Sequence, residues 1–240
     1  MYFDLDIIPL GPIDILSIKS LIKDIPESAW EQDKRRLANK NFEETHTLWL
    51  RLMPMTADKI FHVFENLQVC GVPTLEKKID NLHLDIEKAL DGFIIRSSII
   101  RLEPGNHVHR HVDGIHPLFV YGRRLIIPII TNPYVIFQYE DDRNYNLQEG
   151  IIYDTNGFVP HCTVNNGSET RYQFVIDLLP NSTREEWNKI NFHKTWTQDQ
   201  YQHAMSLVPD WHTNNVLPDW RTIRDEQKKM YDASRLLLHR

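Results

Sequence analysis

From Gly92 onward, the spacing of the apolar residues in this 240-residue chain changes from helical to extended. Upstream, residues 75–90 carry apolar side chains at the intervals of an amphipathic helix. Downstream, short apolar runs alternate with turn signals such as Pro104-Gly105 and Asn165-Asn166-Gly167-Ser168. Many short strands separated by turns are typical of a sandwich or barrel, not of β-α-β units. We therefore expect a mainly β core over residues 92–180, within an α+β chain.

Seven segments of this core are predicted as strands from their apolar runs or their alternation. They are 93–95, 99–102, 125–130, 134–139, 147–153, 158–164 and 172–179. Strands that are apolar on both faces suit a barrel whose outside is covered by helices. Segments 13–25, 56–68 and 75–90 supply such helices, Ser28 is the expected N-cap of another short helix, and 45–53 is an additional strand.

The stretch from Asn106 to Gly114 holds a row of side chains that can bind a metal. On an extended strand, alternate side chains share one face, so this row is expected to point in one direction. Its members are His107, His109, His111 and Asp113. A histidine and a carboxylate two residues apart on a strand are well placed to bind the same ion.

Two residues further along the chain, His161 and Arg171, fit the same site. Two imidazoles and one carboxylate on one face of an octahedron leave the other positions open, as in non-haem Fe(II) oxygenases. A structural zinc site would instead close four positions, usually with cysteines, and this chain has only Cys70 and Cys162. A single His-x-Asp pair occurs by chance in many chains, so the interpretation depends on the order and spacing of the whole set.

That whole set resembles the aspartyl/asparaginyl β-hydroxylase family of 2-oxoglutarate-dependent oxygenases, which also contains proline hydroxylases. The resemblance covers about residues 94–179. Its motifs, in chain order, are Pro104-Gly105, His111-x-Asp113, Arg124-Leu125-x-x-Pro128, Gly150, Asp154, His161-x-x-x-Asn165, Arg171 and Phe174-Val175-Ile176-Asp177. The resemblance implies a double-stranded β-helix core, a jelly-roll and cupin-like fold, with the N-terminal helices packed outside.

The resemblance also implies roles for individual residues. It identifies His111, Asp113 and His161 as the ligands of Fe(II). It identifies Arg171 as the clamp on the far carboxylate of 2-oxoglutarate, and it places Arg124 near the co-substrate or the substrate. Dioxygen would be the second co-substrate, and ascorbate would support the reaction in vitro.

Two positions depart from the family pattern. Ile126 stands where family members often carry a histidine, and Ile100 stands where a serine can help to bind 2-oxoglutarate. Both concern the co-substrate pocket and leave the iron ligands unaffected. Asp154 and Asn165 either hold the metal-binding imidazoles in place or form turns, and the sequence leaves both interpretations open.

These features predict a dioxygenase that hydroxylates an unactivated C–H bond of an amino acid or of a residue in a cytosolic peptide or protein. One alternative is a cupin-type metalloenzyme that does not use 2-oxoglutarate, and Arg171 argues against it. Another is a non-catalytic binding module, which would bind Fe(II) without turning over 2-oxoglutarate.

Composition and charge limit the classes of partner that this chain is expected to bind. A formal net charge of −6 offers no positive surface for nucleic acid or for an anionic membrane. The first residues are acidic rather than basic, unlike a signal peptide, and no apolar run approaches the roughly 20 residues that cross a bilayer. Two cysteines make no disulfide framework. We expect a cytoplasmic protein that acts on a small amino acid or a peptide.

Two regions are expected along the chain. Residues 1–180 would form the oxygenase domain, with its β-helix core at about 92–180, and residues 181–240 a helical C-terminal appendage. The appendage holds four of the six tryptophans, Trp187, Trp196, Trp211 and Trp220, which is unlike a disordered tail. It could pack on the barrel, cover the active site or form a homodimer contact.

Overall fold

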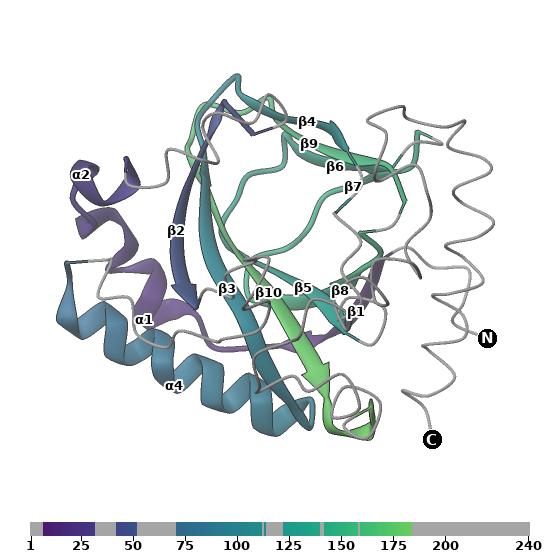
Figure 1. Cartoon of the computed structure of the whole chain (residues 1–240). Helices are drawn as coiled ribbons and strands as arrows, with labels where there is room; N and C mark the ends of the chain where they lie inside the picture. The colour runs from purple at the N-terminus through teal and green to yellow at the C-terminus, as the bar shows by residue number, and fades with distance from the viewer. Residues whose placement is uncertain are drawn as a thin grey trace, which may run out of the picture.

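The chain forms two antiparallel β-sheets that face each other, with helices on the outer side of the larger sheet (Figure 1). The structure is a computed structural model and describes residues 7–31, 42–51, 71–111, 113, 122–139, 142–157 and 159–183. Within these ranges, no helix is long and apolar enough to cross a membrane.

The larger sheet has six strands in the order β1-β8-β5-β10-β3-β2. Their bounds are Ile7–Pro12 (β1), Ile151–Thr155 (β8), Arg123–Ile130 (β5), Arg171–Pro180 (β10), Gly92–Leu102 (β3) and Thr45–Arg51 (β2). The smaller sheet has four strands in the order β4-β9-β6-β7. Their bounds are His107–His111 (β4), His161–Asn165 (β9), Val135–Tyr139 (β6) and Asn144–Tyr145 (β7).

Between β3 and β10 the chain passes back and forth between the two sheets. Strands β3, β5, β8 and β10 lie in the larger sheet, whereas β4, β6, β7 and β9 lie in the smaller one. In each sheet a late strand pairs between two early ones: β10 between β3 and β5, and β9 between β4 and β6. This winding is that of a double-stranded β-helix, a relative of the jelly roll, so the expected fold class is confirmed.

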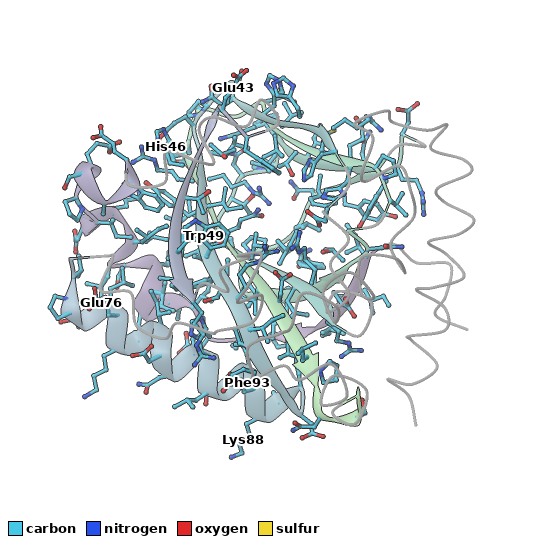
Figure 2. The ribbon with its side chains drawn as sticks, in the orientation of Figure 1. Glu43, His46, Trp49, Glu76, Lys88 and Phe93 are labelled. Carbon is cyan, nitrogen blue, oxygen red and sulfur yellow. The ribbon has the colours of Figure 1, made fainter. Side chains whose placement is uncertain are left out.

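Alternation along β10 separates an apolar core from a polar interior. Phe174, Ile176 and Leu178 are fully buried against the helices on the outer face of the larger sheet. Burial of each such side chain contributes about 1.5–3 kcal/mol of hydrophobic free energy. Arg171 and Asp177 occupy the opposite face of β10, which is turned toward the smaller sheet. The space between the sheets is filled by side chains, many of them polar (Figure 2).

The helix that covers this core most extensively is α4 (Pro73–Ala89). Its buried face holds Leu75, Ile79, Leu82, His83 and Ile86. The labelled side chains of Glu76 and Lys88 lie on its outward side (Figure 2). The sequence predicted this helix at 75–90, and Pro73 starts it two residues earlier, because proline is favoured in the first helical turn.

Other predictions needed correction. The single helix predicted over 13–25 is instead a short helix α1 (Leu16–Lys19) followed by a 3₁₀ turn η1 (Ile22–Asp24). The next helix, α2, spans Glu27–Trp30, so its N-cap is Pro26 and not Ser28. The predicted helix at 56–68 lies outside the described residues. So does the C-terminal appendage beyond η2 (Asn181–Thr183), and its boundary and role stay predictions.

His83 is a buried imidazole on α4. Its side chain is almost completely inaccessible, and neither ring nitrogen has a hydrogen-bond partner among the described residues. Burial, assisted by the charge of Arg51, lowers the pKa of His83 to about 3. The neutral ring is therefore the form that the folded protein accepts.

We predict that His83 makes the protein sensitive to acid. Because its pKa is depressed in the folded state, its contribution to stability is complete above pH 6.5 and is lost as the pH falls toward 3. Between pH 7 and pH 4.5 the wild type should lose about 2–3 kcal/mol more unfolding free energy than His83→Leu. Urea denaturation at both pH values measures this difference, and an equal loss in the two proteins would contradict it.

Candidate active site

The pairing of β4 with β9 brings two of the predicted ligands together. His111 and His161 are directly opposed residues of the two strands, with ring centroids 4.5 Å apart. Asp113 lies just beyond the end of β4, where its N–H donates to the carbonyl of Gly157 at 2.8 Å. Its carboxylate oxygens lie 3.6 Å from Nε2 of His111 and 3.8 Å from Nε2 of His161.

Backbone carbonyls orient both imidazole rings. Nδ1 of His111 lies 2.7 Å from the carbonyl oxygen of His109, and Nδ1 of His161 lies 2.8 Å from that of Val159. Because a carbonyl can only accept, each Nδ1 carries the proton, and each Nε2 presents its lone pair toward Asp113. A ring nitrogen that is held in this way is the usual support of a metal-binding histidine.

Protonation states also suit a metal. Burial lowers the pKa of His161 to about 4, so this imidazole is neutral at pH 7. Burial opposes ionisation of Asp113, but the nearby Arg124 and the two histidines hold its pKa well below the usual range. His161 therefore offers a neutral imidazole and Asp113 an ionised carboxylate.

One carboxylate oxygen of this group has no hydrogen-bond partner among the described residues. Oδ2 of Asp113 is buried and accepts no hydrogen bond from any described residue. The donor atoms of His111, Asp113 and His161 all lie within 4.8 Å of one another. A divalent cation fits this arrangement, since it would bind the orphaned oxygen and both Nε2 atoms at once.

Aromatic rings and a glycine shape the surroundings. Phe42 lies edge-on to His111, and Phe137 stacks on His161 with 5.4 Å between ring centroids. A side chain on Gly157 would overlap the carboxylate of Asp113, so only glycine leaves that carboxylate its place. Nothing in the local sequence distinguishes Gly157 from an ordinary turn glycine, so its role could not be predicted.

The four-member row predicted on one face of β4 is wrong. The register with β9 shifts between Val108 and His111, which inserts one extra residue as a β-bulge. Val108 and His111 consequently both face the interior, whereas His107 pairs with Val164 on the other face. His109 packs against His107, with ring centroids 4.1 Å apart.

Arg124 lies between two carboxylates. It is ion-paired with Asp113, and its Nε and Nη2 donate to Asp177 at 2.8 and 3.2 Å. Arg96 is ion-paired with Asp177 as well. The described contacts of Arg124 thus connect it to the carboxylate of Asp113, a candidate metal ligand. The expected contact of Arg124 with the co-substrate or the substrate stays a prediction.

Arg171 is different. It begins β10, is 1% exposed, and has no carboxylate partner among the described residues. Burial alone lowers its pKa to about 9, and its Nε lacks a hydrogen-bond partner within the described part of the chain. Gln173 lies two residues further along the same face of β10, and its Oε1 is also buried and has no hydrogen-bond partner among the described residues.

The sequence left the roles of Asp154 and Asn165 open, and neither is the described partner of Nδ1 in His111 or His161. Asn165 organises the turn that follows β9, because its side chain bonds to Leu102, Gly167 and Glu169. Asp154 pairs with Arg123 at 3.2 Å. The backbone carbonyls of His109 and Val159 hold the two imidazole rings instead. Backbone contacts of this kind cannot be recognised in a sequence.

Comparison with known proteins identifies no family for this chain. No family model matches it, and no curated protein matches it. Similar solved structures include an oxidoreductase of the 2OG-Fe(II) oxygenase family from Burkholderia pseudomallei, at 12% identity over 70% of this chain and 90% of that one, with a TM-score of 0.43. Others are a Pseudomonas putida prolyl-4-hydroxylase (12%, 75% and 95%, TM-score 0.43) and a viral collagen prolyl hydroxylase from Paramecium Bursaria Chlorella virus-1 (11%, 74% and 97%, TM-score 0.42).

We predict that Asp177→Asn weakens metal binding although Asp177 does not touch the metal group. Without this carboxylate, Arg124 loses one of its two anionic partners and competes more strongly for Asp113. Loss of such a supporting contact typically costs 10- to 100-fold in metal affinity. Anaerobic titration with Co(II) or Fe(II) measures it.

The matched control is Asp154→Asn, which removes a buried carboxylate that is paired with Arg123. Asp154 lies opposite Leu125, a residue of the helix-covered core, so it occupies the outer face of the larger sheet. This control should leave metal affinity unchanged. An equal loss in both variants would show general destabilisation and would contradict a specific role for Asp177.

Proposed function

We propose that this chain is an Fe(II)- and 2-oxoglutarate-dependent dioxygenase that hydroxylates an unactivated C–H bond of an amino acid or of a residue in a peptide or protein. The observation that carries the proposal is Arg171, a buried cation without a protein anion among the described residues, in the same β-helix as a convergent His-Asp-His group. Such a charge is costly to bury unless a ligand carboxylate completes it.

Each group has one task in this proposal. His111, Asp113 and His161 would hold Fe(II) on one side and leave its other positions open. Arg171 would bind the far carboxylate of 2-oxoglutarate with its planar fork, which matches two carboxylate oxygens. The bound iron, with 2-oxoglutarate and dioxygen, supplies the oxidising chemistry that no side chain of this protein can supply.

The surrounding residues would orient the ligands and exclude water. Phe42 and Phe137 cover the two imidazole rings, and Arg124, itself paired with Asp177, holds the carboxylate of Asp113. Arg171 and Asp177 lie on the same face of β10, and Arg124 joins that face to Asp113. The proposed carboxylate clamp and the proposed metal ligands therefore face a common interior.

Succinate release tests the proposal directly. Protein supplied with Fe(II), 2-oxoglutarate and ascorbate should release succinate, and a panel of free amino acids and peptides should identify the substrate class by stimulating it. His111→Ala, Asp113→Ala and His161→Ala should each abolish release, because each removes a ligand. Folded wild-type protein that binds Fe(II) but releases no succinate with any substrate would favour a cupin-type enzyme or a binding module.

A second prediction concerns Arg171, which should act on 2-oxoglutarate and not on the metal. A charged hydrogen bond contributes about 1.5–3 kcal/mol, so Arg171→Met should raise the 2-oxoglutarate Kd about 10- to 100-fold. Arg171→Lys keeps the charge but loses the fork, and its effect should be intermediate. Fe(II) affinity should change little in either variant.

The unfolding free energy of Arg171→Met is a second measurement that tests the role of Arg171. Replacing a buried cation that has no anionic partner among the described residues by an apolar side chain should raise the unfolding free energy of the ligand-free protein, by about 1–4 kcal/mol. Arg101→Met is the matched control, because Arg101 is also buried but makes two hydrogen bonds to Glu27. The control should lower stability and leave 2-oxoglutarate binding intact. If Arg171→Met also lowered the unfolding free energy and left 2-oxoglutarate binding intact, Arg171 would have a structural role and would not bind the co-substrate.

A further inference from the structure

A second group of metal-binding side chains lies on the other face of β4. Glu44, in the turn before β2, accepts a hydrogen bond from the backbone N–H of His107 at 2.9 Å, and the same carboxylate oxygen lies 2.7 Å from Nδ1 of His107. Nε2 of His107 lies 3.0 Å from Nδ1 of His109. The labelled Glu43 marks this turn, at the end of the molecule where β4 begins (Figure 2).

The β-bulge makes this group separate from the first one. It turns His107 away from the interior that holds His111, so the two histidines cannot bind the same ion. β4 is also the edge strand of the smaller sheet, and His107 and Glu44 are about one third exposed. A metal ion can therefore reach the outer group from solvent without entering the β-helix.

The distances fit a bound ion. Two nitrogens that each lie about 2.1 Å from one metal are roughly 3.0 Å apart at the 90° angle of octahedral coordination and roughly 3.4 Å apart at the tetrahedral angle. The 3.0 Å between the two ring nitrogens therefore suits neighbouring octahedral positions. The donor atoms of Glu44, His107 and His109 all lie within 4.8 Å of one another. Without a metal, the two imidazoles must share one proton between Nε2 and Nδ1, because two lone pairs at that distance repel each other.

The donor types select the ion. Two imidazoles and one carboxylate suit Zn²⁺ and its first-row neighbours, whereas Ca²⁺ and Mg²⁺ prefer sets made of oxygen. We propose that Glu44, His107 and His109 form a second site for a divalent transition metal, distinct from His111, Asp113 and His161. This second site does not depend on the proposed function, and metal binding alone can test it.

Zinc stoichiometry tests the proposal. Chelator-treated, full-length protein should bind two equivalents of Zn²⁺ in calorimetric titration, one at each group. His107→Gln and His109→Gln should each weaken one equivalent at least about tenfold, as should Glu44→Gln. His161→Ala should instead remove the other equivalent and leave this one in place. Titration with Mg²⁺ should give no binding at the outer group.

The control is His46→Gln, because His46 lies close in sequence to Glu44 but belongs to neither group. It should retain both equivalents. Zinc binding that is unchanged in His107→Gln and His109→Gln would overturn the proposal, as would a single equivalent that disappears in His161→Ala. One equivalent that survives His161→Ala and is lost in His109→Gln would support this site while counting against the metal group of the proposed function.

Discussion

The pairing of β4 with β9 is the interaction on which the proposed metal group depends. It places His111 opposite His161, although the two residues are far apart in the sequence. The larger sheet completes the arrangement from the other side, because Arg124 on β5 holds the carboxylate of Asp113 and is itself held by Asp177 on β10. The group is therefore supported by both sheets, and the double-stranded β-helix is what brings these sheets face to face.

Buried charge distinguishes Arg171 from the other arginines of the β-helix. Arg101 is paired with Glu27, and Arg124 with Asp113 and Asp177. The fold thus compensates a buried guanidinium where a carboxylate can be supplied, and Arg171 has none among the described residues. A natural protein that breaks a stability rule at one position usually does so for function. This contrast, within a single structure, is the strongest physical argument for an anionic ligand.

Most of the β core could be predicted because its strands alternate or run apolar between turns, as at 172–179 for β10 (Arg171–Pro180). β1 (Ile7–Pro12) was missed because Pro9, Gly11 and Pro12 are typical of a loop, yet an edge strand tolerates proline because one of its sides has no pairing strand. Along the site, the expected roles of His111, Asp113, His161 and Arg171 came from a family resemblance that their order and spacing carry, and the structure brings the first three together. The supports of the imidazoles could not be predicted, because the carbonyls of His109 and Val159 leave no trace in the side-chain sequence.

The β-bulge in β4 determines which histidines of this stretch lie beside Asp113. On a regular strand, His109 would share the interior face with His111 and Asp113, and a further imidazole would stand beside the metal. Extra protein ligands close a site and leave no position for a co-substrate. The inserted residue turns His107 and His109 outward, toward Glu44, and leaves two imidazoles and one carboxylate inside. One irregularity in one edge strand thus divides the histidines between two chemically different environments.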